Sequence, residues 1–173
     1  LIFAPALALF LTALFALWPS IEPRRANLAS SRVPYAVGWI GAVGILAGVH
    51  IVIVMTARGV VLDVAGYAVA GVSILLIALG NFLGKSRANF FLGVRTPWSL
   101  SSDLSWEKSN RLSGRLFVVT GIVTLGALVA MGQAAALYTL ISGTVVSAIC
   151  GIAASYVYWK RDPDGHAGDG ILE

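Results

Sequence analysis

Long apolar stretches alternate with short polar segments along the chain, and this pattern predicts five membrane-crossing helices. A hydrocarbon core of about 30 Å requires about 20 helical residues. Five apolar stretches approach that length, at residues 1–18, 33–57, 60–83, 116–131 and 134–159. Lipid offers no hydrogen-bond partners to the backbone, so continuous apolar stretches of this kind form helices. We therefore predict an all-α, polytopic transmembrane helix bundle in which residues 1–173 form a single membrane domain.

The longest polar interruption, residues 81–115, separates the third span from the fourth. A connection of about 35 residues is usually either functional or disordered. Disordered segments contain few large apolar side chains, whereas this one has Phe90, Phe91, Trp98 and Trp106 interleaved with its cations. We expect it to fold against the inner face of the membrane.

Two helix starts are predicted within this inner segment. Thr96 followed by Pro97 is typical of a capping residue and the first helical position after it. Residues 103–115 are expected to form a helix that runs into the fourth span, with Glu107 and Arg111 as an i, i+4 ion pair. Arg95 precedes the cap, and its five donors suit either the free backbone carbonyls at the end of the preceding span or an anion. Interfacial anchoring by Arg and Trp is the simpler alternative.

The composition excludes an ordinary soluble domain, and the cations give the chain an orientation. The chain is 58% hydrophobic and only 12% charged, with a mean hydropathy of +0.86. Every Lys and Arg except Arg58 falls in the first loop, the inner segment with its helix ends, or the tail. The positive-inside rule therefore places residues 81–115 and the C-terminus in the cytoplasm. Cations placed in this way serve topology, and we expect no direct nucleic-acid binding.

The first span raises two further expectations. Residue 1 already lies within an apolar run, so we expect upstream sequence, including one more helix that would return the N-terminus to the cytoplasm. Glu22 follows Trp18 and Pro19 and is expected to be a solvated helix end at the headgroups.

Small residues recur along two of the spans. Such stripes allow the backbones of neighbouring helices to approach closely. Packing within one chain is the favoured interpretation, and a homodimer face is the alternative. The stripes are Gly38, Gly41, Gly44 and Gly48 in the second span, and Gly143, Ser147, Gly151 and Ser155 in the last.

Groups that could catalyse a reaction or hold a metal are sparse. The two histidines, His50 and His166, are far apart in the sequence, and Cys150 is the sole cysteine. Neither a multi-His metal site nor a thiolate cluster is expected from such a set. We predict no enzyme, no cofactor and no metal. His50 lies at membrane depth and is a candidate intramembrane polar site, with a plain hydrogen bond to a neighbouring helix as the alternative.

The inner segment resembles the signature of the SdpI/YfhL family of bacterial membrane immunity proteins. An Arg-Thr-Pro-Trp run followed by Trp and by Asn-Arg is not demanded by membrane physics, so the motif is specific. Ser99 stands where the family usually has Thr, which retains the hydroxyl. The closing residues 154–160 are similar as well. The positions that carry the resemblance are Gly80-Asn81, Asn89, residues 93–100 (GVRTPWSL), Trp106 and Asn110-Arg111.

This resemblance implies a multi-pass protein of the bacterial cytoplasmic membrane that protects the cell from a secreted peptide toxin of the SdpC type. It implies a second partner too, a cytoplasmic transcriptional repressor that the toxin-engaged protein sequesters. Membrane lipids complete the expected partners.

We place the predicted site in the inner segment, with Arg95 as a clamp for an anion or carbonyl and Trp98 and Trp106 as anchors. The alternative function is a small transporter or lipid-handling membrane enzyme with an inner-leaflet polar pocket. That alternative requires convergent ionisable groups at membrane depth, where the sequence offers little beyond His50. A subunit that only packs with another membrane protein is a third candidate. The remaining predicted site residues are Asn81, Asn89, Thr96, Pro97, Asn110 and Arg111.

Overall fold

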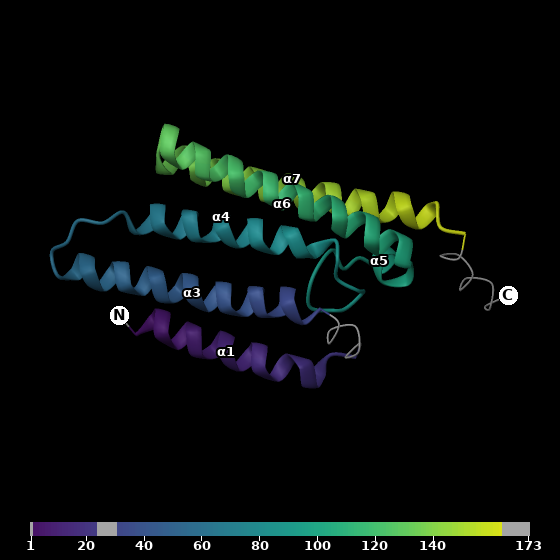
Figure 1. Ribbon diagram of the computed structural model, residues 1–173, viewed down its shortest axis with the longest axis horizontal. Coiled ribbons are helices and arrows are strands. Elements are labelled where there is room, and N and C mark those ends of the chain that lie inside the picture. The colour runs from purple at the N-terminus through teal and green to yellow at the C-terminus, as the bar shows by residue number, and fades with distance from the viewer. Residues whose placement is uncertain (1, 24–30, 164–173) are drawn as a thin grey trace.

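The computed structural model describes residues 2–23 and 31–163, and these residues form six helices (Figure 1). Five of the helices are long and apolar enough to cross a membrane, which confirms the predicted all-helical, multi-pass architecture. Arg24, Arg25 and His166 lie outside the described residues. The helices are α1 (Phe3–Ile21), α3 (Arg32–Ala57), α4 (Val64–Leu83), α5 (Pro97–Ser101), α6 (Asp103–Met131) and α7 (Gln133–Lys160).

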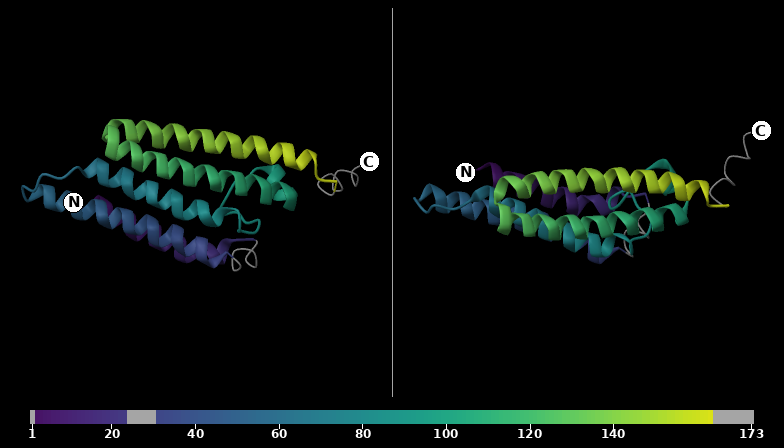
Figure 2. Two further views of the ribbon diagram at one scale, coloured as in Figure 1. Left: turned by 45° about the horizontal axis from the view of Figure 1, so that its top comes forward. Right: turned by 90° about the horizontal axis from the view of Figure 1, so that it is seen from above.

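The long helices lie side by side in the order of the sequence. α1 packs on α3, α3 on α4, α4 on α6, and α6 on α7, so the bundle is a row of roughly parallel rods (Figures 1 and 2). The short α5 lies against α6 and α7 at the end of the molecule where the chain leaves α4 (Figure 1). This arrangement gathers the inner segment, the start of α6 and the end of α7 into one region.

The third span begins later than the predicted residue 60. Gly59 has a φ of +91°, a conformation that favours glycine, and residues 60–63 have no regular secondary structure. The Asp63 carboxylate then accepts a hydrogen bond from the Gly66 backbone N–H at 2.9 Å and caps α4. The capping carboxylate sets the start of the helix, although the apolar run begins three residues earlier.

The first span ends later than predicted, because Pro19 is accommodated in the last turn of α1. Proline has no N–H and leaves the carbonyl four residues before it without its helical partner. That carbonyl belongs to Phe15, and the Tyr35 hydroxyl from α3 donates a hydrogen bond to it. A tertiary contact therefore allows α1 to continue through the proline to Ile21.

The α6–α7 hairpin uses the small residues of the last span. Gly132 turns the chain with a φ of +85°, and the stripe on α7 faces α6. A Cβ at Gly143 would lie 2.6 Å from Thr120, and one at Gly151 would lie 2.3 Å from the Ser113 hydroxyl. The stripe is thus engaged within the chain, as the favoured interpretation predicted.

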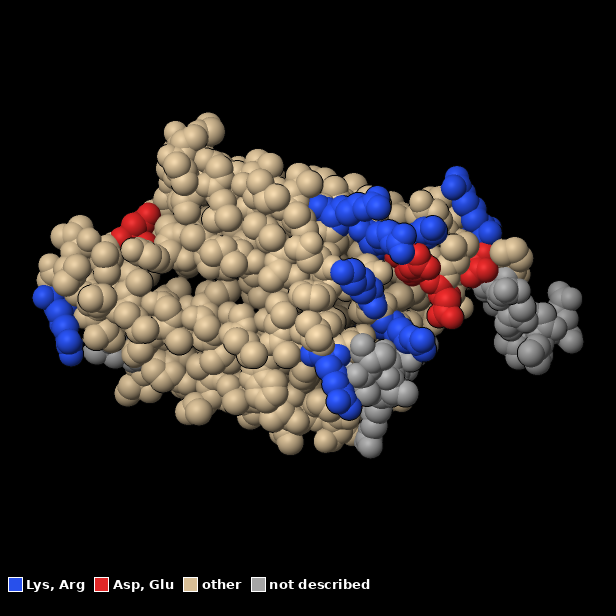
Figure 3. Space-filling model, viewed as in Figure 1, with Lys and Arg blue, Asp and Glu red and all other residues tan. Residues whose placement is uncertain are grey.

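Lys and Arg gather at the end of the molecule that holds the inner segment, and the long apolar surface separates them from the opposite end (Figure 3). The two ends of this surface lie where the polar headgroups of a bilayer would meet the protein. The candidate site belongs to the basic end.

Candidate functional site

The loop between α4 and α5 is built around the side chain of Asn89. Its Oδ1 accepts hydrogen bonds from the backbone N–H groups of Phe91 and Leu92, at 2.9 and 2.7 Å. Its Nδ2 donates to the Arg87 carbonyl at 2.7 Å. Asn89 is fully buried, so its amide takes the place of water for a loop backbone that has no regular secondary structure. This explains why an asparagine stands at this motif position.

Two side chains of α6 hold the same loop from the other side. Asn110 Oδ1 accepts a hydrogen bond from the Val94 N–H at 2.7 Å, and Trp106 Nε1 donates to the Ser86 carbonyl at 2.8 Å. Trp106 is only 3% exposed. Gly93 adopts a φ of +103°, and a Cβ there would lie 2.2 Å from Asn110 Oδ1. The motif glycine is therefore required by its backbone conformation and by the close approach of Asn110.

The predicted helix start is confirmed in detail. Thr96 Oγ1 accepts a hydrogen bond from the Ser99 N–H at 3.1 Å, Ser99 Oγ accepts one from the Thr96 N–H at 3.0 Å, and Pro97 takes the first helical position. This reciprocal capping box needs a hydroxyl at position 99, which serine supplies. Glu107 and Arg111 also form the expected ion pair, at 2.8 Å.

Arg95 belongs to the same loop and is exposed. Its Nη1 donates a hydrogen bond to the Phe90 carbonyl at 2.6 Å. The guanidinium therefore braces a carbonyl of the loop, whereas the sequence suggested a carbonyl at the end of the preceding span. An Arg has five donors, and this bond uses one of them.

Phe91 connects the loop to the first two helices. Its ring lies among the aromatic rings of Phe15, Trp18 and Tyr35, with centroids 4.8–5.3 Å away. Aromatic contacts of this kind add about 0.5–1.5 kcal/mol each beyond the area that they bury. The loop therefore fixes α1 and α3 relative to α6.

Glu22 corrects an expectation, because it is buried at 1% exposure and is not a solvated helix end. Its carboxylate accepts hydrogen bonds from Trp18 Nε1 and from the Phe90 N–H, both at 3.1 Å. The loop folds over the end of α1 and removes this carboxylate from water. A local reading of the sequence could not show this, because Phe90 lies 68 residues away.

The other side of the inner segment is joined to α7. Thr96 Oγ1 lies 2.8 Å from Ser155 Oγ, and Ser105 Oγ donates to the Ser155 carbonyl at 2.6 Å. The rings of Trp98 and Tyr156 meet edge to face at 5.1 Å. The loop and its partners on α1, α5, α6 and α7 therefore form a single hydrogen-bonded unit, here called the motif unit.

A cavity of about 350 Å³, here called the motif pocket, lies between this unit and the helices. It is mostly apolar, but the Ser113 hydroxyl on its wall is buried and has no hydrogen-bond partner among the described residues. An unpaired buried hydroxyl is costly and suits a ligand that can pair with it. The pocket is lined by Leu83, Gly93, Val94, Arg95, Thr96, Ser113, Phe117, Ser147, Ala148 and Ile152.

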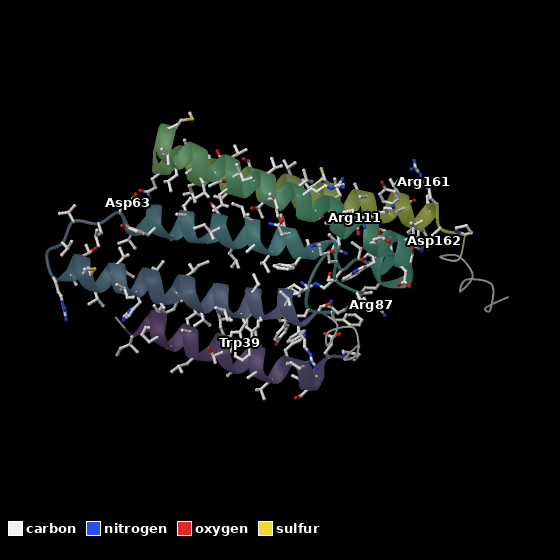
Figure 4. All side chains as sticks on the ribbon, viewed as in Figure 1. Trp39, Asp63, Arg87, Arg111, Arg161 and Asp162 are labelled. Carbon is white, nitrogen blue, oxygen red and sulfur yellow. The ribbon has the colours of Figure 1, made fainter. Side chains whose placement is uncertain are left out.

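The structure does not bring all the predicted site residues together. Asn81 and Arg111 lie outside the motif unit, in a separate groove between α4 and α6. Asn81 donates a hydrogen bond to the Ile77 carbonyl of its own helix. His50 is in α3, which lines neither the motif pocket nor that groove. Within residues 2–23 and 31–163, no three His, Cys, Asp or Glu side chains are grouped as metal ligands. Figure 4 shows Arg111 on α6 and Arg87 in the loop at the basic end.

Sequence reasoning did not identify Phe91, Ser155 or Glu22 as parts of this unit. Their partners are far away in the chain, so the stripe that contains Ser155 and the apolar character of Phe91 did not reveal these contacts. Ser113 was accessible to sequence reasoning, because it shares a helix face with Trp106 and Asn110.

Comparisons with known proteins cover the same region. Residues 85–159 match the SdpI/YfhL protein family, a segment that extends from the motif loop almost to the end of α7. The chain is also similar to the immunity protein SdpI of Bacillus subtilis (strain 168), with 30% identity over 91 residues. The match covers 53% of this chain and 44% of that protein, so the chain spans less than half the length of this relative. No solved structure gives a significant match.

Proposed function

We propose, from the premise that this chain belongs to the SdpI/YfhL family through residues 85–159, that it is a membrane immunity protein. It would protect the cell against a secreted antimicrobial peptide toxin by binding and not by catalysis. The observation that carries the proposal is that the family segment and the folded motif unit coincide, from Asn89 to Ser155. The similarity to an immunity protein supports the same function.

The motif pocket is the proposed contact for the toxin. Ala148 and Ile152 on its wall are exposed on the surface of α7, where lipid would surround the protein. A peptide that has entered the bilayer could therefore reach the pocket from the side. The apolar side chains of the peptide would contact the apolar wall of the pocket, and one of the peptide's backbone groups would form a hydrogen bond with the Ser113 hydroxyl.

The experiment compares toxin-sensitive bacteria that express the wild-type chain, Ala148→Phe or Ala153→Phe. Phe at position 148 fills the motif pocket, whereas position 153 is exposed on the same helix and does not line the pocket. At equal membrane levels, Ala148→Phe should restore sensitivity to a mature SdpC-type peptide, and Ala153→Phe should protect like wild type. Full protection by Ala148→Phe would contradict the pocket as the contact. Failure of the wild-type chain to protect would contradict immunity itself.

The cytoplasmic part of the proposal is the sequestration of a transcriptional repressor after toxin binding. The exposed cations at the basic end support an acidic protein partner there, given the orientation that the positive-inside rule predicts. A reporter under the repressor's promoter in the same cells should respond to toxin only when the wild-type chain is present. Repression that does not change with toxin in protected cells would remove the repressor from the proposal and leave immunity standing.

A further inference from the structure

A second site lies beside the motif unit at the basic end of the molecule, where α4 crosses α6. Gly80 and Gly114 meet at this crossing: a Cβ on either would lie 2.5 Å from the carbonyl oxygen of the other. One turn further along, at the residue that follows α4, a Cβ on Gly84 would lie 3.0 Å from the Arg111 backbone. The two backbones therefore touch, and the side chains beside the glycines form two facing walls.

These walls enclose a cavity of about 520 Å³, here called the basic groove. Asn81 and Lys85 lie on one wall, four residues apart, and Arg111 and Arg115 lie on the other with the same spacing. Val118 and Val119 continue the α6 wall toward the middle of the span. The groove thus combines three cations and an amide at one end with apolar side chains at the other.

The charges of the groove are only partly neutralised by the protein. Glu107 pairs with Arg111, and each side chain is half exposed. In the described part of the chain, neither Lys85 nor Arg115 forms an ion pair; Lys85 Nζ lies 6.0 Å from the ring centre of Phe82. Cations that face each other without a counter-ion favour the binding of an anion.

The position of the groove along the helices matches the edge of a bilayer. Arg115 is the last charged residue of α6, and residues 116–131 span about 24 Å at 1.5 Å per residue. This approaches a hydrocarbon thickness of about 30 Å. Lys85 follows the apolar helix α4 in the same way. The cations therefore lie at headgroup depth, and Val119, which is 56% exposed, lies at the depth of the acyl chains.

We infer that the basic groove binds an anionic phospholipid. The phosphate diester would lie between Lys85, Arg111 and Arg115, with one acyl chain along Val118 and Val119. Asn81 uses one N–H for the Ile77 carbonyl and has a second for a phosphate or glycerol oxygen. Basic pockets between transmembrane helices bind such headgroups for the same reason. The site shares none of its lining with the motif pocket, so it is distinct from the proposed toxin contact.

The test uses the purified full chain in detergent and measures retained lipid by native mass spectrometry. The probes are phosphatidylglycerol, phosphatidylcholine and inorganic phosphate. The groove variant is Lys85→Gln/Arg115→Gln. The matched control is Arg87→Gln/Arg161→Gln, which removes two exposed cations from the same end of the molecule without touching the groove (Figure 4). Single Arg115→Gln serves if the double variant is not folded by size-exclusion chromatography and circular dichroism.

Wild type should retain phosphatidylglycerol in preference to phosphatidylcholine. With each surface cation worth about fivefold in affinity, the groove variant should bind phosphatidylglycerol about 30-fold more weakly, and single Arg115→Gln about fivefold more weakly. The control should bind like wild type. Equal losses in the groove and control variants would reduce the effect to overall charge and overturn the site. Inorganic phosphate that competes fully with the lipid at equal concentration would overturn the lipid as the ligand, because the acyl wall would then contribute nothing.

Discussion

The two sides of this molecule use glycine very differently. Where α6 packs on α4 and α7, Gly114, Gly121, Gly143 and Gly151 each lie so close to a neighbour that a Cβ would approach it within 2.6 Å. On the other side, α3 and α4 leave an apolar groove of about 620 Å³, which opens between them in Figure 3. Gly44 and Gly48 lie on that groove with no atom near the place of a Cβ.

This difference shows that a small residue brings two helices into backbone contact only where the opposite helix also presents backbone or a short side chain. At Gly41 on α3 the near neighbour, 2.5 Å from the place of a Cβ, is the end of the Leu75 side chain. Gly80 and Gly114 face each other where α4 crosses α6. Gly71 on α4, in contrast, meets the branched side chain of Ile45, which holds α3 away. The spacing of small residues in one helix therefore does not predict close packing by itself, because the facing residues of the partner helix also decide it.

The largest expected effect comes from a side chain placed at the tight crossing. Gly114→Leu should destabilise the protein by about 3 kcal/mol or more, because the clash is with the Gly80 backbone and cannot be relieved by a rotamer change. Gly44→Leu introduces the same side chain into open space and should not destabilise the protein, because leucine is also a better helix former than glycine. Unfolding in mixed micelles measures both. Similar losses would mean that α3 and α4 pack as tightly as α4 and α6.

An intermediate effect is expected from the motif loop. Asn110→Leu leaves the Val94 N–H without its acceptor and should cost about 1–3 kcal/mol. Asn81→Leu removes only a bond within its own exposed helix face and should stay within about 0.5 kcal/mol. The same unfolding measurement distinguishes them. Equal losses of stability in the two variants would mean that Asn81 belongs to the motif unit, from which the structure separates it.

The smallest effect tests the glycines themselves. Gly48→Ala should stabilise the protein by up to about 1 kcal/mol, since alanine is the better helix former and nothing lies near its Cβ. Gly143→Ala should destabilise it, because Thr120 lies 2.6 Å from the new atom. Thermal unfolding of the two variants should move in opposite directions. A stabilised Gly143→Ala would show that α6 and α7 tolerate a wider separation.

Much of the fold was predictable from the sequence, and so was part of the candidate site. The five spans follow from apolar length, and the α5 start follows from the short-range bonding of Thr96, Pro97 and Ser99. Arg95 was predicted to bind a free carbonyl at the end of the preceding span or an anion, but the carbonyl that it binds is that of Phe90 in the loop. Asn81 and Arg111, however, were grouped with Asn89 and Asn110 because they lie in one motif. Nearness in the sequence did not reveal that α4 and α6 carry them to another surface.

The sequence by itself determined the membrane class, the number of spans and the local starts of the helices, because these depend on composition and on hydrogen bonds between near neighbours. Only the tertiary structure decided which glycine stripe is tightly packed, that Glu22 is buried, and that the motif divides between a pocket and a basic groove. These features depend on distances between residues far apart in the chain. The folding of the motif loop over α1 and the close crossing of α4 with α6 set those distances.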